Sequence, residues 1–153
     1  MVMDQHQIFG YLLHDVLRLY KRRFEQRSAQ LSLTLPQCKT LSLLARNEGI
    51  SQRQLADLAD IDAMSIVRIL DRMEADGWVE RRAGPADRRA RRLAVTAKAR
   101  PILDQILQMG AATRTEVLDG LNVEQRDQLV SLLEKVHTNL QGLKPLVAQE
   151  IGS

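Results

Sequence analysis

A chain of 153 residues, with 44% hydrophobic and 27% charged side chains, has the size and balance of an ordinary globular protein that buries a core. Its net charge of only +3 excludes a uniformly basic protein that coats nucleic acid. No apolar run reaches the roughly 18 residues that span a bilayer, and the first residues lack a signal-peptide pattern. We therefore expect a cytoplasmic protein without a membrane partner.

Two helices are expected first. Apolar side chains recur with a helical period from Ile8 to about Ser32, which predicts a long first helix with a wide apolar face. Thr34 and Gln37 then form a capping-box pattern, so a second helix should run to about Asn47.

The next two helices are short and close together. Ser51 and Gln54 form a second capping-box pattern, and the helix that they begin should end near Asp60. Asp62 can cap the following helix, from 63 to about 76, before a glycine ends it in a left-handed conformation. Two short helices joined by a tight turn are typical of a helix-turn-helix motif.

The second of these helices is the candidate for reading DNA bases, because polar donors lie on its outer face at helical spacing. Arginine in the major groove is the commonest reader of guanine. The candidate residues on this helix are Met64, Ser65, Arg68 and Arg72. At the start of the preceding helix, Ser51, Gln52 and Gln54 are candidates for phosphate contacts that fix register, although capping alone explains Ser51 and Gln54 equally well.

A β-hairpin should follow, from the segments WVERRA and ARRLAV, with Val79, Leu93 and Val95 facing inward. Asp87 is the one acid from Arg81 to Thr96, where six arginines lie, and an aspartate in a turn can bond its own backbone. The arginines are Arg81, Arg82, Arg88, Arg89, Arg91 and Arg92. Their mutual repulsion opposes folding unless an external anion, such as a phosphate backbone, screens it. The hairpin is therefore interpreted as a DNA-facing wing.

Two further amphipathic helices are expected after the hairpin. Thr96 can cap the first, with Pro101 tolerated early in it, and Asn122 can begin the second after Gly120. The last helix carries leucines in a near-heptad stripe. Apolar stripes of this kind, like that of the first helix, require a partner subunit to cover them, so we expect a homodimer.

Few residues suggest catalysis or metal binding. His6, His14 and His137 lack ligand spacing, and no nucleophile elbow, phosphate loop or pair of carboxylates occurs. Cys38, the single cysteine, falls on the apolar face of its helix, so core packing is favoured over redox sensing, which stays open. We expect no enzyme, no metal and no cofactor.

In its helix-turn-helix and hairpin segments the chain resembles the MarR family of transcription regulators, and within it the SlyA-type members. The resemblance covers nearly the whole chain and rests on the segments LSLTLPQCKTLSLLA, SQRQLADLADIDAMSIVRILDRMEADGWVERR and GPADRRARRLAVTAKARPIL. The closing stretch TRTEVLDGLNVEQRDQLVSLLEKVHTNL is similar to SlyA-type C-termini. Val95 and Ala99 depart mildly from the family pattern, which usually has leucine at the first position and often glycine at the second.

The resemblance implies that Ser65 and Arg68 face the major groove, that Arg88 enters the minor groove and that Asp87 orients the wing arginines. It also implies a small aromatic carboxylate or phenolic effector, held between the dimerisation helices and the winged domain. Arg18 on the first helix could hold the carboxylate of such an effector, although a surface ion pair explains Arg18 equally well. The candidate pocket residues are His14, Arg18 and Tyr20.

The sequence therefore predicts a mainly α protein with a small β-hairpin wing. A winged helix-turn-helix at 35–99 should lie between a dimerisation helix at 1–34 and dimerisation helices at 100–153. As a homodimer it should bind double-stranded DNA at a pseudo-palindromic operator and regulate transcription. The alternative is a winged-helix protein-interaction module that does not bind DNA. Such a module should carry apolar or acidic residues on the outer face of the helix from 63 to about 76.

Overall fold

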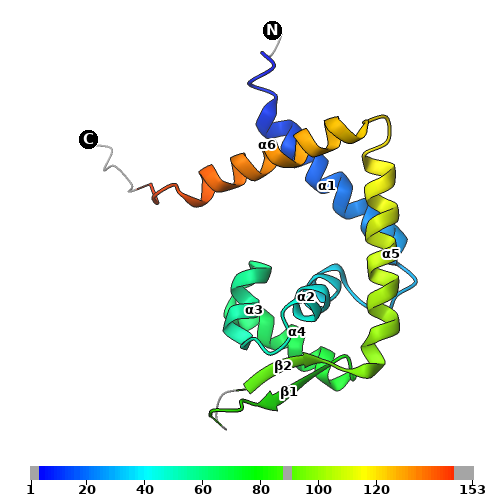
Figure 1. Ribbon diagram of the computed structural model, residues 1–153, viewed down its shortest axis with the longest axis vertical. Coiled ribbons are helices and arrows are strands. Elements are labelled where there is room, and N and C mark those ends of the chain that lie inside the picture. Colours follow the sequence, from blue (N-terminus) through cyan, green and yellow to red (C-terminus); the bar gives the residue numbers. More distant parts are fainter. Residues whose placement is uncertain (1–3, 88–90, 147–153) are drawn as a thin grey trace, which may run out of the picture. The chain divides into compact units, whose positions relative to one another are not determined.

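The computed structural model of the chain describes residues 4–87 and 91–146. Contacts within the chain divide it into two compact units, Met1–Thr115 and Glu116–Ser153, and each is described by itself. The fold is mainly helical with a two-stranded antiparallel hairpin, as expected. The elements in chain order are α1 Phe9–Ser28, α2 Leu35–Arg46, α3 Gln52–Ala59, α4 Ala63–Ala75, β1 Val79–Ala83, β2 Arg91–Val95, a 3-10 turn Ala97–Ala99, α5 Arg100–Val117 and α6 Val123–Gln141 (Figure 1).

Helix starts follow local capping rules. Thr34 and Gln37 cap α2 reciprocally, and Ser51 and Gln54 do the same for α3, which confirms both predicted boundaries. The expected end of the first helix at about Ser32 is wrong, because α1 ends at Ser28. The chain turns there so that Leu33, only 7% exposed, can enter the core, and this burial outweighs further helical hydrogen bonds.

The core of the first unit is mostly aliphatic, in line with the 3% of aromatic residues in the sequence. Leu41 and Leu44 of α2 and Leu70 of α4 are fully buried. Cys38 is 1% exposed and belongs to the same core cluster. The inward-facing residues expected for the hairpin are also buried there, namely Val79, Leu93 and Val95.

The hairpin is joined to the helices by backbone hydrogen bonds. Val79 pairs with Val95, and Arg81 with Leu93, in an antiparallel register. Leu93 also donates its N–H to the carbonyl of Ile50 (3.0 Å) and accepts from the N–H of Gly49 (2.8 Å). Gly49 has a φ of +86°, which a residue with a Cβ adopts only with strain. The stretch between α2 and α3 is therefore fixed to the wing strand β2.

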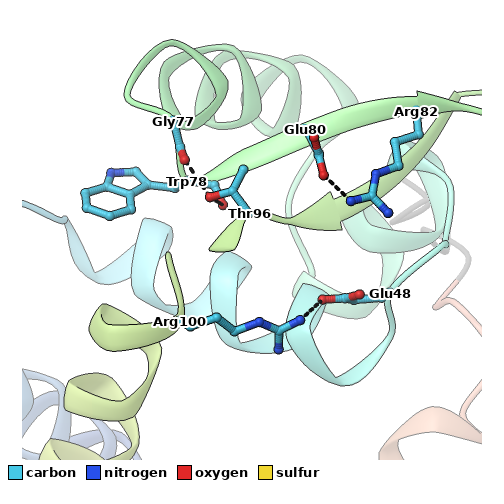
Figure 2. A network of polar contacts seen from close by, with 7 residues as sticks. All are labelled: Glu48, Gly77, Trp78, Glu80, Arg82, Thr96 and Arg100. Atoms are coloured by element: carbon cyan, nitrogen blue, oxygen red, sulfur yellow. Dashed lines mark hydrogen bonds and ion pairs between the residues drawn. The ribbon is translucent and has the colours of Figure 1, made fainter. Parts of the chain in front are cut away.

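Thr96 does not cap the helix that follows it, contrary to expectation. Its hydroxyl instead donates to the carbonyl of Gly77 at 2.6 Å, which ties the end of the hairpin to the residue after α4 (Figure 2). A 3-10 turn intervenes, and α5 begins at Arg100 with Pro101 in its first turn. Pro101 is tolerated there because it lacks only an N–H that the first turn leaves unpaired.

The second unit contains α6, which Asn122 and Gln125 cap reciprocally, in agreement with the expected start. None of the described residues of α6 is buried. Its large exposed apolar residues are Val123, Leu129, Val130, Leu132, Leu133 and Leu140.

Candidate nucleic-acid interface

Helix α4 has a buried inner face and an exposed polar outer face. Ile66, Leu70 and Met73 are at most 1% exposed and fix the helix to the core. On the other side Arg68 is exposed, and Met64 is 70% exposed. A rigid helix with an exposed arginine on its outer face can present that side chain to a DNA groove.

The turn between α3 and α4 is held by several contacts. Asp60 ends α3 in the left-handed region with a φ of 53°, and the N–H of Ile61 donates to the carbonyl of Ala56 at 3.0 Å. Lys39 of α2 donates its ammonium to the carbonyl of Ala59 at 2.6 Å. These contacts set the angle at which α4 leaves the turn. The sequence predicted the position of the turn but not the lysine that holds it.

The first turn of α4 joins two polar residues. The Oδ1 atom of Asp62 accepts from the N–H of Ser65 at 2.9 Å, and its Oδ2 atom accepts from the Ser65 hydroxyl at 2.6 Å. These bonds hold the pKa of the Asp62 carboxyl below its usual range. Asp62 is therefore an ionised cap, and Ser65 is oriented by it. Farther along the helix, Arg72 pairs with Asp76, with 3.2 Å between Nε and Oδ2.

At the start of α3 the candidate phosphate-contact residues are already engaged within the protein. Ser51 and Gln54 exchange the two capping hydrogen bonds, at 3.2 and 2.9 Å. The side-chain oxygen of Gln52 accepts from Arg81 at 3.2 Å. The capping roles of Ser51 and Gln54 are thus plain, and their phosphate contacts stay a prediction.

Arg81 lies at the base of the wing with its side chain turned toward the helices. Its guanidinium contacts Asp71 at 2.8 Å and Glu74 at 3.2 Å, and its side chain is only 13% exposed. The sequence counted Arg81 with the DNA-facing arginines, whereas the structure uses it to fasten β1 to α3 and α4. Strand alternation could have indicated this, since Arg81 shares a face of β1 with the buried Val79.

The other described arginines of the wing are exposed. Arg82 pairs with Glu80 on the same strand (Figure 2), Arg91 is exposed, and Arg92 donates to the carbonyl of Gly49 at 3.2 Å. Asp87 is exposed as well. The wing-tip candidates Arg88 and Arg89 lie outside the described residues.

The passage from the wing to α5 is fixed by polar contacts. Besides the Thr96 hydroxyl, the Lys98 ammonium donates to the carbonyl of Asp76 at 2.8 Å and lies 4.7 Å from the centre of the Trp78 ring. Arg100 pairs with Glu48 at 3.0 Å, so the start of α5 is tied to the stretch between α2 and α3 (Figure 2). The hairpin therefore has little freedom at its base.

A separate pocket of about 390 Å³ lies among α1, α2 and α5 within the first unit. Its walls are largely apolar, with the aromatic rings of Tyr20 and Phe24 on one side. Four cationic side chains and no acid are among the residues that line it. The cations are Lys21, Lys39, Arg46 and Arg114.

Of the three pocket residues expected from the sequence, Tyr20 lines this pocket. His14 and Arg18 are not among its lining residues, and Arg18 lies 3.6 Å from Asp15 on the exposed side of α1. The four cations could not be predicted as a group from the sequence, because they come from α1, α2 and α5 and only the packing of these helices brings them together.

Cys38 also lines this pocket while remaining 1% exposed. Burial raises the pKa of its thiol, so little thiolate forms at neutral pH. Within the described ranges, 4–87 and 91–146, no three His, Cys, Asp or Glu side chains gather as metal ligands would. In the same ranges no helix has the length and apolar character needed to cross a membrane.

A helix-turn-helix followed by a hairpin between longer helices is the arrangement of winged-helix regulators. Residues 33–90 match the MarR family. The MarR match covers α2, α3, α4 and β1, which include the whole outer face of α4.

Solved transcriptional regulators have the same fold over nearly their full length. The transcriptional regulator PA3341 is 29% identical, with a TM-score of 0.81 over 88% of this chain and 99% of its own. A mutant of MarR from E. coli, solved with operator DNA, is 28% identical, with a TM-score of 0.75 over 88% of this chain and 99% of its own. The transcriptional regulator SlyA, at 23% identity, has a TM-score of 0.78 over 86% of this chain and 93% of its own, which supports the fold.

Proposed function

We propose that this chain is a MarR-family transcription regulator of the SlyA-like subgroup that binds double-stranded DNA with sequence specificity. The observation that carries the proposal is α4, whose inner face is buried while Arg68 is exposed on its outer face. The exposed Arg91 on the neighbouring wing strand adds positive charge for a phosphate backbone. The similarity to an E. coli MarR solved with operator DNA supports the same function.

Selection from random duplexes, followed by titration of the enriched sequences, tests the proposal. Arg68→Ala should weaken binding by about 1 to 3 kcal/mol and relax the preference at one base position. Arg22→Ala, which removes an exposed arginine from α1, is the matched control and should leave that preference intact. Equal behaviour of the two variants would contradict the assignment of α4.

The wing tip is proposed as a second DNA contact. The resemblance to the MarR family implies that Arg88 enters the minor groove and that Asp87 orients Arg88. An arginine in the minor groove would let the wing read groove shape. Arg88→Ala should cost about 1 to 3 kcal/mol of operator affinity and reduce the salt slope by about one. An unchanged affinity and slope would remove the tip from the interface.

We further propose that the protein acts as a homodimer. Side chains on α1 such as Phe9, Leu12 and Val16 are about half exposed, and so are Val130 and Leu133 on α6. Apolar faces of this extent need a cover in water. A two-fold dimer would then read a pseudo-palindrome with half-sites about 10 bp apart, or a multiple of that spacing.

Sedimentation velocity over a dilution series tests the dimer. The wild type should sediment as a dimer at micromolar concentration. Leu133→Asp should shift it toward monomer because a buried unpaired carboxylate is costly at an interface. Ser131→Asp, at another exposed position of the same helix, adds the same single negative charge and is the control. A wild-type monomer at micromolar concentration would contradict the proposal.

The pocket among α1, α2 and α5 is proposed to bind the effector, a small aromatic carboxylate or phenol. Apolar and aromatic walls suit a ring, and the four cations suit an anionic group. The proposed contact with the anionic group therefore moves from Arg18 to the four lining cations, and Tyr20 stays a proposed pocket residue.

Calorimetric titration with 2-hydroxybenzoate tests the pocket. Arg114→Gln should weaken binding by about 1.5 to 3 kcal/mol if its guanidinium holds the carboxylate. Arg18→Gln, whose side chain pairs with Asp15 outside the pocket, should bind like the wild type. Failure of the wild type to bind this probe, or the reverse order of the two variants, would count against the site.

A further inference from the structure

The Asp62 and Ser65 pair at the start of α4 constrains the direction of a single hydrogen. Both oxygens of the Asp62 carboxyl accept from Ser65, one from its N–H at 2.9 Å and the other from its hydroxyl at 2.6 Å. An ionised carboxylate can only accept, so the Ser65 hydroxyl must be the donor in the second bond. The lowered pKa of Asp62 keeps that carboxylate ionised at neutral pH.

A hydroxyl has one hydrogen and two lone pairs. Once Asp62 has accepted the hydrogen of Ser65, the Ser65 oxygen can offer only lone pairs to any further partner. Serine usually tolerates either kind of partner because its hydroxyl rotates freely. Here the neighbouring carboxylate removes that freedom, and Ser65 becomes an acceptor alone.

Ser65 lies where a recognition helix meets base edges. It is the third residue of α4, and the exposed Arg68 follows one turn later on the same side. The N-terminal residues of such helices contact bases in the major groove. The donors presented there are the exocyclic amines of adenine and cytosine, whereas guanine and thymine present acceptors.

We infer that Ser65, oriented by Asp62, determines specificity by accepting a hydrogen bond from adenine or cytosine on the contacted strand. Guanine or thymine at that position would set an acceptor against the lone pairs of Ser65, which leaves both groups without a hydrogen. Asp62 acts as a positioning residue through Ser65. The inference rests on the proposed DNA-binding function and adds the class of base that is read.

The experiment first locates the position by selection from random duplexes with the wild type and with Ser65→Ala. At one position the wild type should prefer adenine or cytosine over guanine or thymine about tenfold, the usual scale of one mismatched pair. Ser65→Ala should bind all four bases there with similar affinity. If adenine is preferred, its replacement by a purine nucleotide lacking the N6 amine should cost the wild type a similar factor and leave Ser65→Ala unaffected.

Asp62→Asn is the decisive variant because asparagine is also a preferred helix cap, so the start of α4 should be kept. Its amide oxygen must face the N–H of Ser65, so its NH₂ group faces the hydroxyl and donates to it. The hydroxyl hydrogen is then released toward the DNA, and the preference should move to guanine or thymine. Thermal melting should confirm that the variants remain folded.

Two results would overturn the inference while leaving DNA binding intact. One is that Ser65→Ala keeps the adenine or cytosine preference of the wild type at each position where the wild type shows one. The other is a preference unchanged in Asp62→Asn. A wild type that enriches no duplex would instead overturn the proposed function itself, and the inference with it.

Discussion

Arg81 on the first wing strand forms an ion pair with Asp71 on α4, with 2.8 Å between Nη2 and Oδ1. The same guanidinium reaches Glu74 at 3.2 Å and Gln52 of α3 at 3.2 Å, so one side chain joins three elements. Its charge is neutralised within the protein and is not free for a phosphate. The position of the wing relative to α4 therefore depends on this contact.

Arg81→Ala should destabilise the fold by about 1 to 3 kcal/mol, because two carboxylates and an amide lose a charge-assisted partner. Urea unfolding measures this change. Operator affinity should fall as well, since the wing loses its attachment to α4. Arg82→Ala is the matched control, because the Arg82 side chain is 63% exposed and pairs with Glu80 on its own strand. It should change stability by less than about 0.5 kcal/mol, and equal losses for the two variants would refute the role of Arg81.

The local features of the fold could be predicted because each depends on a few neighbouring residues. The reciprocal caps at Thr34 and Ser51 follow from side chains three residues apart. Gly77 adopts a φ of +81° where the helix was expected to end in a left-handed residue. The inward residues of the hairpin follow from the alternation of strand side chains.

Features that depend on packing between distant segments could not be predicted in the same way. The pocket cations Lys21, Arg46 and Arg114 come from α1, α2 and α5, and only the packing of those helices brings them to one cavity. Thr96 has the sequence of a cap, yet its hydroxyl reaches the carbonyl of Gly77 because the hairpin returns the chain to that point. Helical periodicity carries no information about either contact.

Thr96→Val should cost about 0.5 to 1.5 kcal/mol of stability, because the Gly77 carbonyl loses its hydroxyl donor while the side-chain volume is kept. Thr96→Ser should retain most of the stability. Thr115→Val removes a hydroxyl that bonds within the exposed surface of α5 and serves as the control. The free energy of unfolding in urea distinguishes these variants, and a Thr96→Val loss no greater than that of Thr115→Val would contradict the proposed tie.

The capping role of Asp62 should give a pH-dependent contribution to stability. Its folded pKa lies below the usual value, so its stabilising effect is complete above about pH 4 and is lost as the pH falls through the folded pKa. The wild type should therefore be more stable than Asp62→Asn at pH 7, and the difference should shrink below about pH 4. Asp57→Asn controls for the removal of an exposed carboxylate. A difference that is constant from pH 7 to pH 3 would show that the charge of Asp62 does not contribute.

Cys38 provides a direct probe of the pocket, since it is the single cysteine and lines that cavity. Its raised pKa and its 1% exposure should make alkylation by iodoacetamide at pH 7 much slower in the folded protein than in urea. Raising the pH should speed the folded reaction, because the thiolate is the reacting form. If 2-hydroxybenzoate occupies the pocket, it should slow alkylation further in the wild type and less in Arg114→Gln. Mass spectrometry reads the modification at one site, and equal rates in folded and unfolded protein would show that Cys38 is not packed as described.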